Sequence, residues 1–586
     1  MIFIRKVSLI LLFSFISCSA FTKEKLSETN SQKIERQIQA KLSELADSGL
    51  DSVTYAVLYG NGTSKSGIVG NLSLKPDTQF KIGSITKLFT GIAILQLQEQ
   101  RKLNLDDPIS KFIPEVKRMA TREKNYREIT IRDVLIHRSG LPSDLSNGFF
   151  LDPNASNEDI LKNFRDLPKI LPSLERNEPG KVHSYSNFGF GLLGIVIERA
   201  ANQSIEEYFQ KNIFQKAGMS NTNLLESEDH SKLSGGYSGI FWKSKTNRPI
   251  IRDLTAGSLA TTGGDLARFM TSFFASKRNQ GLLSKKSFDE FHKSQVSDRA
   301  IDSMDIGLPV MKKKFFGDKR VYYSYGHSGS LPPFISDLTY EIETETASFL
   351  STNTLTLATG KVIATNQSIW KLVFEEQTGS KPEPPSLPKL ENLNPTKDFL
   401  GTYVSSLGIH EVKDGNPNKL NFFNFDFKLT EVDNRYKLNL EILFGLITIR
   451  DPALDSLRVE FEEWKGEKIF TVYSEESPKG MLGVATRFEP DFQYPKREFF
   501  GNYKVKDPFA LTKKIKLEND KRGFVKLAVY YSLGGAENEA SFACRVDSDG
   551  NLRILGYGRN LGEKLVLKES EKGLKILYSG YEFEKD

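Results

Sequence analysis

Cysteine is almost missing from this chain. Only two of its 586 residues are cysteines, Cys18 and Cys544. If Cys18 is removed or modified together with the N-terminal segment, no disulfide can form within the chain. Burial of apolar side chains must then hold the fold together in place of covalent crosslinks. We expect Cys544, in an apolar stretch, to be a buried strand residue without a catalytic role.

Histidine is also scarce, and charge of one sign does not accumulate. The six histidines are scattered, and neither H-E-x-x-H nor a pair of C-x-x-C motifs occurs. We therefore expect no metal site and no cofactor. The 80 basic and 74 acidic residues leave a formal charge of +6, with no basic patch interleaved with aromatic residues. Nucleic acid is therefore excluded as an expected partner.

Long apolar runs are lacking too, and the one short run lies at the N-terminus. Arg5 and Lys6 precede an apolar stretch at 7–16 and small residues at 17–20, the order of a secretory signal peptide. We expect residues 1–20 to direct export to the cell envelope, with a soluble product in the periplasm as one outcome. The other is an outer-membrane lipoprotein, because FISC at 15–18 resembles a loose lipobox that would lipidate Cys18 and anchor the protein to a membrane.

Composition divides the rest of the chain. Its length exceeds that of one domain, and the segment 379–395 has five prolines, typical of a linker. We expect residues 30–378 to form one mixed domain in which strands from both ends build a single sheet. Period-two alternation follows, for example at 423–429 and 436–442, as in half-buried antiparallel strands.

This last region repeats itself. PTKDFLGTY at 395–403 returns as PKREFFGNY at 495–503, with Phe, Gly and Tyr in equal places. We expect two antiparallel all-β units, at 396–494 and 495–586. Each resembles a lipocalin-like barrel, a closed architecture that leaves no strand edge exposed.

Three short segments carry the candidate chemistry. SITK at 84–87 places a hydroxyl and an amine one helical turn apart. FKIG precedes it and an apolar stretch follows at 88–97, so we expect Ser84 at a helix N-terminus, where free backbone N–H groups favour negative charge. The other two S-x-x-K copies, at Ser368 and Ser386, lack this turn-to-helix setting. The second and third segments are YSN at 185–187 and HSG at 327–329.

These residues permit acyl transfer through a serine nucleophile. A serine hydroxyl needs a neighbouring base, and either Lys87 or Tyr185 can take the proton from Ser84. Asn187 would orient Lys87 and donate to a substrate carbonyl. The backbone N–H of Ser84 supplies one oxyanion donor, and Gly329 lets a substrate backbone approach closely.

In this order, the segments resemble the β-lactamase-related serine hydrolases: class C β-lactamases, D-alanyl-D-alanine carboxypeptidases and related esterases. HRSGLP at 137–142, YSNFGFGLLG at 185–194 and GHSG at 326–329 support the resemblance, which spans about residues 53–371. It implies an α+β fold, with an antiparallel sheet flanked by helices and a helical subdomain. It also implies an acyl-enzyme on Ser84, a second oxyanion donor in the backbone N–H of Ser330, and substrate binding by His327, Ser328 and Gly329.

The third segment departs from the true β-lactamases, which have Lys where this chain has His327. Since histidine is mostly neutral at neutral pH, we expect weaker recognition of a substrate carboxylate. The sequence therefore predicts an exported serine hydrolase acting on amide or ester bonds of small or peptidoglycan-type D-amino-acid substrates. The alternatives are a small-ester esterase and a catalytically silent binding protein.

Overall fold

The computed structural model describes the chain from residue 30 to residue 586. Segments outside this description are 72, 122–125, 144–149, 152–162, 181–182, 225–230, 240–242, 247–249, 296–305, 319, 384–392, 406–407, 417, 423–424, 443–446, 450–456, 465, 475–476, 506–511, 534–535, 557–562, 572 and 579–580. The expected signal peptide and much of the proline-rich linker lie outside the described residues. Within them, no helix is both long and apolar enough to cross a membrane.

A six-stranded antiparallel sheet forms the centre of the first domain, in the order β12-β13-β14-β15-β1-β2. Its strands are β1 (Ser52–Leu58), β2 (Ser64–Gly70), β12 (Met311–Phe316), β13 (Val321–Leu331), β14 (Phe334–Glu341) and β15 (Thr346–Thr352). β1 pairs with β15, so that Val53 lies opposite Thr352. The expectation of one sheet built from both ends of the domain is confirmed.

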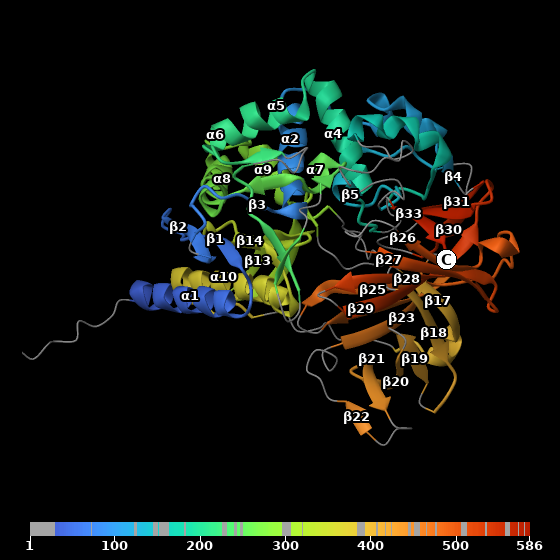
Figure 1. The fold of residues 1–586 in the computed structure, drawn as a ribbon. Helices are drawn as coiled ribbons and strands as arrows, with labels where there is room; N and C mark the ends of the chain where they lie inside the picture. The colour runs from blue at the N-terminus through green and yellow to red at the C-terminus, as the bar shows by residue number, and fades with distance from the viewer. Residues whose placement is uncertain are drawn as a thin grey trace, which may run out of the picture.

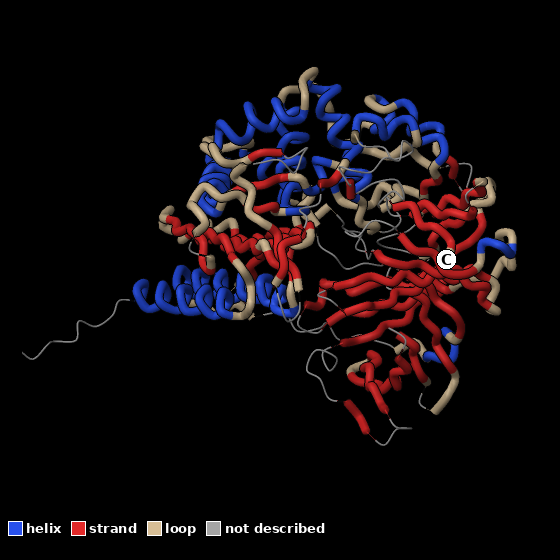
Figure 2. Tube along the Cα trace, in the orientation of Figure 1, coloured by secondary structure: helices blue, strands red, loops and turns tan. Residues whose placement is uncertain are grey.

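Helices cover both faces of this sheet (Figures 1 and 2). On one face, α1 (Asn30–Asp47) and α10 (Lys361–Thr378) share an apolar cluster with β1 and β15. On the other lie α2 (Thr86–Glu99), α4 (Asn187–Ala201), α7 (Leu254–Gly257), α8 (Gly263–Ala275) and α9 (Lys285–His292). α2 is buried from its first residue through Leu97, which fits a helix that is apolar on all sides.

Short elements complete the domain. The helices are α3 (Ile131–Leu135), α5 (Ile205–Phe209) and α6 (Gln215–Ala217). The strands are β3 (Phe80–Lys81), β4 (Ala120–Thr121), β5 (Phe150–Leu151), β6 (Glu175–Arg176), β7 (Asn223–Leu224), β8 (Gly236–Ser238), β9 (Ser244–Thr246), β10 (Ile250–Ile251), β11 (Leu259–Thr261) and β16 (Thr354–Leu355).

Two antiparallel barrels follow. The first contains β17 (Gly401–Ser405), β18 (Gly408–Lys413), β19 (Lys419–Phe422), β20 (Phe425–Val432), β21 (Arg435–Ile442), β22 (Ile447–Ile449), β23 (Leu457–Trp464), β24 (Glu467–Ser474) and β25 (Ser477–Arg487). These strands form one sheet in the order β20-β19-β18-β17-β25-β24-β23-β21-β22, and the additional pairing of β20 with β21 closes it. The second is a closed barrel of β26 (Gly501–Val505), β27 (Thr512–Asp520), β28 (Phe524–Leu533), β29 (Ala536–Val546), β30 (Leu552–Ile554), β31 (Lys564–Ser570), β32 (Gly573–Tyr578) and β33 (Tyr581–Lys585).

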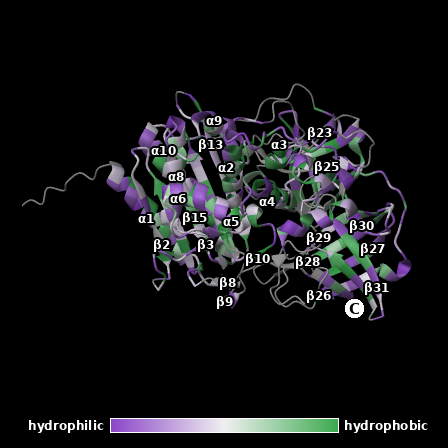
Figure 3. Ribbon diagram, turned by 90° about the horizontal axis from the view of Figure 1, so that it is seen from above, coloured by the Kyte–Doolittle hydropathy of each residue, from purple (hydrophilic) through white to green (hydrophobic). Residues whose placement is uncertain are grey.

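Each barrel has its own apolar interior, and Figure 3 shows apolar and polar residues alternating along strands such as β27. This confirms the expected all-β units and is consistent with a lipocalin-like architecture. Cys544 is buried in the interior of the second barrel, as expected. Val404 of β17 packs with Phe524 and Ala543, so the barrels also touch each other.

The sequence repeat appears as the same opening in both barrels. The Tyr403 hydroxyl donates to the Phe399 carbonyl over 2.8 Å, and the Tyr503 hydroxyl donates to the Phe499 carbonyl over the same distance. The glycine two residues before each tyrosine has a positive φ, 136° and 131° respectively, which a side chain would disfavour. The repeated Phe, Gly and Tyr therefore form one local structure twice.

Candidate active site

Ser84 lies where the sheet meets the central helix. It occupies a single 3-10 turn, Gly83–Ile85, that leads directly into α2. Gly83 has a φ of 51°, and a Cβ added there would lie 2.8 Å from the Ser330 backbone nitrogen. The hydroxyl of Ser336 on β14 donates to the Ile82 carbonyl over 2.8 Å. The turn that carries Ser84 is therefore held against β13 and β14.

Lys87 is fully buried beside Ser84. Its Nζ lies 3.1 Å from Ser84 Oγ, 2.7 Å from Asn187 Oδ1 and 2.7 Å from the Ala256 carbonyl oxygen. Lys87 lies on α2, Asn187 on α4 and Ala256 on α7. A buried amine is thus fixed in hydrogen-bond reach of the hydroxyl, the geometry that activation of a serine nucleophile requires.

Tyr185 and Asn187 reach the site from the start of α4. Ser186 caps this helix, with its hydroxyl accepting from the Gly189 N–H over 2.9 Å. The cap fixes the direction of the residues on either side of it. The Tyr185 ring centroid lies 4.7 Å from Lys87 Nζ and 6.2 Å from the His327 ring. The structure therefore brings together all three segments singled out in the sequence.

His327 is buried on β13 and held uncharged. Burial and the positive charge of Lys87 lower its pKa to about 4, against the smaller opposing effect of a hydrogen bond to the Ser328 carbonyl. That bond joins Nδ1 to the carbonyl oxygen over 2.6 Å. Since a carbonyl only accepts, Nδ1 carries the proton, and Nε2 of the neutral ring is left as an acceptor.

The Ser328 hydroxyl points to the other face of the sheet. It donates to Asp337 Oδ1 over 2.6 Å, and the Asn366 amide of α10 donates to Asp337 Oδ2 over 2.8 Å. Burial raises the pKa of the Asp337 carboxyl, although these donors act in the opposite direction. Ser328 is thus fixed to the sheet and α10, while Gly329 faces the Ser84 turn.

Several residues that contribute to the site were given no role in the sequence analysis. The Ala256 carbonyl is a backbone group that any residue could supply. Asp337 lies eight residues beyond the third segment and outside every motif. His137 belongs to a recognised motif, HRSGLP, but received no role, although its ring stacks on Tyr185 with 4.2 Å between centroids. In the ranges described by the structure, no three His, Cys, Asp or Glu side chains are grouped to hold a metal ion.

A family model described as Beta-lactamase matches residues 33–367, more than half of the 586 residues. The chain belongs to the beta-lactamase family. Members of this family are typically serine hydrolases, and the family match covers Ser84, Lys87, the 185–187 triplet and the 327–329 segment.

Individual relatives of this beta-lactamase-family chain are distant. Protein flp of Staphylococcus aureus strain MRSA252 is 29% identical over 196 residues, 33% of this chain and 37% of that protein. The match therefore spans little more than a third of that relative's length. Beta-lactamase-like protein 2 of Dictyostelium discoideum is 25% identical over 396 residues, 62% of this chain and 70% of that protein.

A solved structure shares the fold. The crystal structure of SurE superposes with a TM-score of 0.56 and 18% identity, covering 78% of this chain and all of that one. At this identity the likeness shows a shared fold alone.

Proposed function

We propose that this protein is a serine hydrolase that forms an acyl-enzyme on Ser84 with small esters or amides, including D-amino-acid peptides of the peptidoglycan type. The observation that carries the proposal is the position of Lys87 Nζ, 3.1 Å from Ser84 Oγ and held by Asn187 and Ala256. As an ammonium, Lys87 has one N–H for each of the three oxygens, and after losing one proton it still donates to Asn187 and Ala256. Its lone pair then accepts the Ser84 proton.

The reaction has two balanced steps. Ser84 Oγ attacks the carbonyl carbon, its proton passes to Lys87 or Tyr185, and the new C–O bond leaves an oxyanion on the former carbonyl. The C–O or C–N bond to the leaving group then breaks, and the leaving alcohol or amine takes up the proton. Water attacks the acyl-enzyme by the same route, which releases the acid and restores the hydroxyl.

Two backbone N–H groups are proposed to hold the oxyanion. One belongs to Ser84 in the turn that leads into α2, and the other to Ser330. The close approach of Gly83 to the Ser330 nitrogen supports this pairing, because it leaves both groups at the same turn. Such preorganised donors are worth a factor of roughly 10² to 10³ in rate each.

His327 favours substrates that do not depend on a carboxylate. A neutral ring with its proton on Nδ1 presents only a lone pair at Nε2, and a lone pair accepts from a substrate N–H but repels an anion. Esters, amides and amino-group-bearing substrates fit this chemistry better than free acids do. This supports the esterase branch of the proposal at least as well as the carboxypeptidase branch.

We further propose that the protein works outside the cytoplasm. The order of basic, apolar and small residues at 1–20 supports export, and Cys18 is the residue at which lipidation would occur. Cell fractionation, with labelled palmitate incorporation compared between the native chain and Cys18→Ser, tests both parts. Recovery only in the cytoplasm would contradict the proposal.

Intact-mass spectrometry tests the catalytic proposal. The purified protein is exposed to a fluorophosphonate and, separately, to a penicillin, with Ser84→Ala as the control. We expect a stoichiometric fluorophosphonate adduct on Ser84 that the control lacks. A penicillin adduct in addition would favour D-amino-acid peptides as substrates, and its absence would favour simple esters. Folded protein that carries no adduct with either reagent would contradict the proposal and favour a binding protein.

A further inference from the structure

His137 is attached to both residues that flank Tyr185. The Ser184 N–H donates to the His137 carbonyl over 2.7 Å. The Ser186 N–H donates to Nδ1 of the His137 ring over 3.1 Å. One residue therefore holds the backbone on each side of Tyr185, although 48 positions separate His137 from Tyr185 in the sequence.

The loop that follows His137 also bonds the backbone around Tyr185. The Ser143 hydroxyl donates to the Tyr185 carbonyl, and the Ser186 hydroxyl donates to the Pro142 carbonyl over 2.6 Å. The Phe188 N–H donates to the Ser143 carbonyl over 3.1 Å. The entry into α4 is thus bonded at several points to a single neighbouring loop.

The His137 ring is also the surface against which the phenol lies. The His137 and Tyr185 rings are stacked, 4.2 Å apart and inclined by 29°. Lys87 Nζ lies 4.7 Å from the centroid of the same tyrosine ring. The Tyr185 ring is therefore in contact with an imidazole that stacks on it and with the amine with which it would share a proton.

His137 makes these contacts as an uncharged ring. Nδ1 accepts from a backbone N–H, so the proton of the neutral ring resides on Nε2. Burial lowers the pKa of His137 well below its usual value, and the neighbouring basic groups of His183, Lys87 and His327 act in the same direction. A cation at this position would be repelled by Lys87.

His137 also carries two unfavourable features. Its φ of 56° lies in the left-handed region that residues with a side chain avoid. Its Nε2 is buried and makes no hydrogen bond with the described residues. Strained backbone and unsatisfied buried groups persist where the surroundings impose them, and such sites are often functional.

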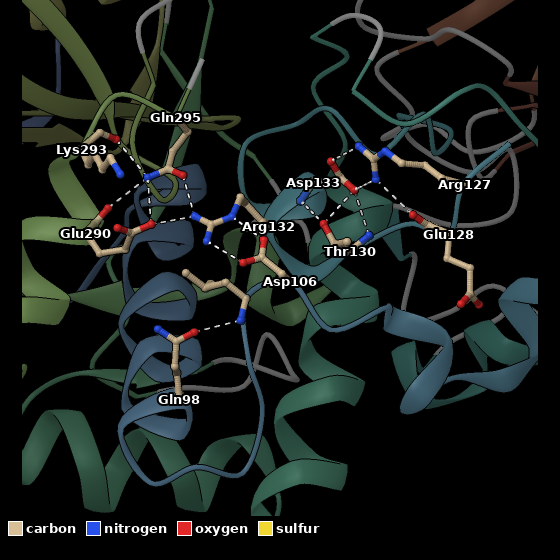
Figure 4. A network of polar contacts seen from close by, with 11 residues as sticks. Gln98, Asp106, Arg127, Glu128, Thr130, Arg132, Asp133, Glu290, Lys293 and Gln295 are labelled. Atoms are coloured by element: carbon tan, nitrogen blue, oxygen red, sulfur yellow. Dashed lines mark hydrogen bonds and ion pairs between the residues drawn. The ribbon is translucent and has the colours of Figure 1, made fainter. Parts of the chain in front are cut away.

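The helix before His137 is bonded to neighbouring segments at several points (Figure 4). α3 begins with a capping box between Thr130 and Asp133, and Arg127 binds the Asp133 carboxylate through two nitrogens, at 2.6 and 2.8 Å. Arg132 of the same helix bonds Glu290 of α9 over 2.7 Å. α3 is thereby tied to the helical subdomain directly ahead of His137.

From these contacts we propose that His137 is the positioning residue for Tyr185, which holds the phenol at a fixed distance from Lys87 so that a proton can pass between them. The inference rests on the proposed function, because the proton transfer matters only if Ser84 reacts. In this role His137 acts through Tyr185 and takes no part in the proton transfer itself.

Substitution of His137 tests this assignment. His137→Ala removes both the ring and the acceptor, whereas His137→Phe keeps a stacking ring and loses the acceptor. His292→Phe is the matched control. His292, the last residue of α9, is also buried and uncharged, because burial lowers its pKa to about 3. Its Nε2 lies 2.9 Å from the Tyr340 hydroxyl. Fluorophosphonate labelling of Ser84 is measured against pH and corrected for the folded fraction.

We expect labelling to slow by about 100-fold or more in His137→Ala and by less in His137→Phe, since the loss of a positioned proton carrier costs a factor of this order. The pH of half-maximal labelling should move by about half a unit or more in His137→Ala and stay unchanged in His292→Phe. Equal rates and equal pH profiles in the His137 and His292 variants would overturn the proposal.

A second measurement does not depend on catalysis. Tyrosine labelled with ¹³C at Cζ gives one signal for Tyr185, assigned by its loss in Tyr185→Phe. We expect this signal to shift or broaden in His137→Ala and to remain in place in His292→Phe. An unchanged signal in His137→Ala would overturn the positioning role. Failure of the native chain to label at all would instead contradict the proposed function, and the two failures are thereby distinguished.

Discussion

Gly329 leaves no room for a side chain where β13 passes the turn before Ser84. A Cβ at this position would lie 1.9 Å from the Ile82 carbonyl oxygen and 2.4 Å from Ser336 Oγ. Real Cβ atoms do not approach backbone oxygen so closely, so the strand and the turn would have to separate. The distance between the two proposed oxyanion donors, on Ser84 and Ser330, therefore depends on this glycine.

Gly329→Ala is expected to slow acylation of Ser84 by about 100-fold, because one of the two donors moves out of reach. The rate of fluorophosphonate labelling measures this, with the melting temperature recorded alongside it. Gly360→Ala is the control, since a Cβ there has no atom within 4 Å and Gly360 has an ordinary φ of −60°. Native labelling rates in Gly329→Ala would show that the close approach is not needed.

His327→Lys should improve recognition of a substrate carboxylate. Lysine adds a permanent charge where the native ring stays neutral, and a charge-assisted hydrogen bond is worth roughly 1.5 kcal/mol, or about tenfold in KM. The measurement compares KM for a carboxylate substrate and its methyl ester in both proteins. An unchanged ratio would contradict the assignment of His327 to this part of the site.

At the scale of single residues, the sequence predicts contacts between side chains that lie one helical turn apart. Ser84 and Lys87 are neighbours because three positions on a helix bring side chains together. Asn187 meets them only because α2 and α4 cross, which motif order suggests but spacing cannot derive. Neither the Ala256 carbonyl nor the bond from Ser328 to Asp337 could be predicted, because both depend on tertiary packing of groups that form no motif.

Among the elements, α3 is notable for being too short to be stable by itself. It has five residues, far fewer than the roughly 12 that an isolated helix needs. Its stability therefore comes from side chains outside it. Arg127 supplies the partner of Asp133, and Arg132 joins the helix to Asp106 and Glu290 (Figure 4).

Asp133→Ala is expected to lower the free energy of unfolding by about 1–3 kcal/mol, because both the cap and the ion pair with Arg127 are lost. It should also slow labelling of Ser84, since His137 follows this helix. Urea unfolding and labelling rates measure the two effects. Lys285→Ala removes an ion pair with Asp289 in which both side chains are 57% exposed, and it should change stability by less than about 0.5 kcal/mol.

Sequence periodicity predicts long elements and misses short ones. The apolar stretch after Lys87 forms α2, and Ser368 lies within α10, as expected for an S-x-x-K copy with no turn before it. β3 and β5 have two residues each, too few for any period to appear. The tertiary fold decides which strands pair with them, namely β11 with β3 and β10 with β5.

At the scale of the whole molecule, four histidines are buried and uncharged. His137, His292, His327 and His410 are each at most 5% exposed. Burial lowers the pKa of His410, inside the first barrel, to about 3. In the unfolded chain, each would instead titrate near 6.5.

The folded protein should therefore lose stability as the pH falls below about 6.5. A depressed pKa means that the unfolded chain takes up protons that the folded one does not, which costs about 1.4 kcal/mol per histidine and per pH unit between the two pKa values. Hydrogen exchange across β17–β24 at pH 7, 6 and 5 measures the loss for the first barrel. His410→Phe should reduce this dependence, and an equally steep loss in that variant would contradict the assignment.

The pairing of β1 with β15 has a consequence for the order in which a newly made chain can fold. Val53 meets Thr352 only after some 300 further residues have been synthesised, so the central sheet stays incomplete, with β1 exposing an unpaired edge, until most of its domain has left the ribosome. Each barrel instead closes on strands made within a single stretch of about 90 residues. A nascent chain stalled before residue 346 would therefore lack the strand that closes its sheet, whereas a barrel needs only its own segment.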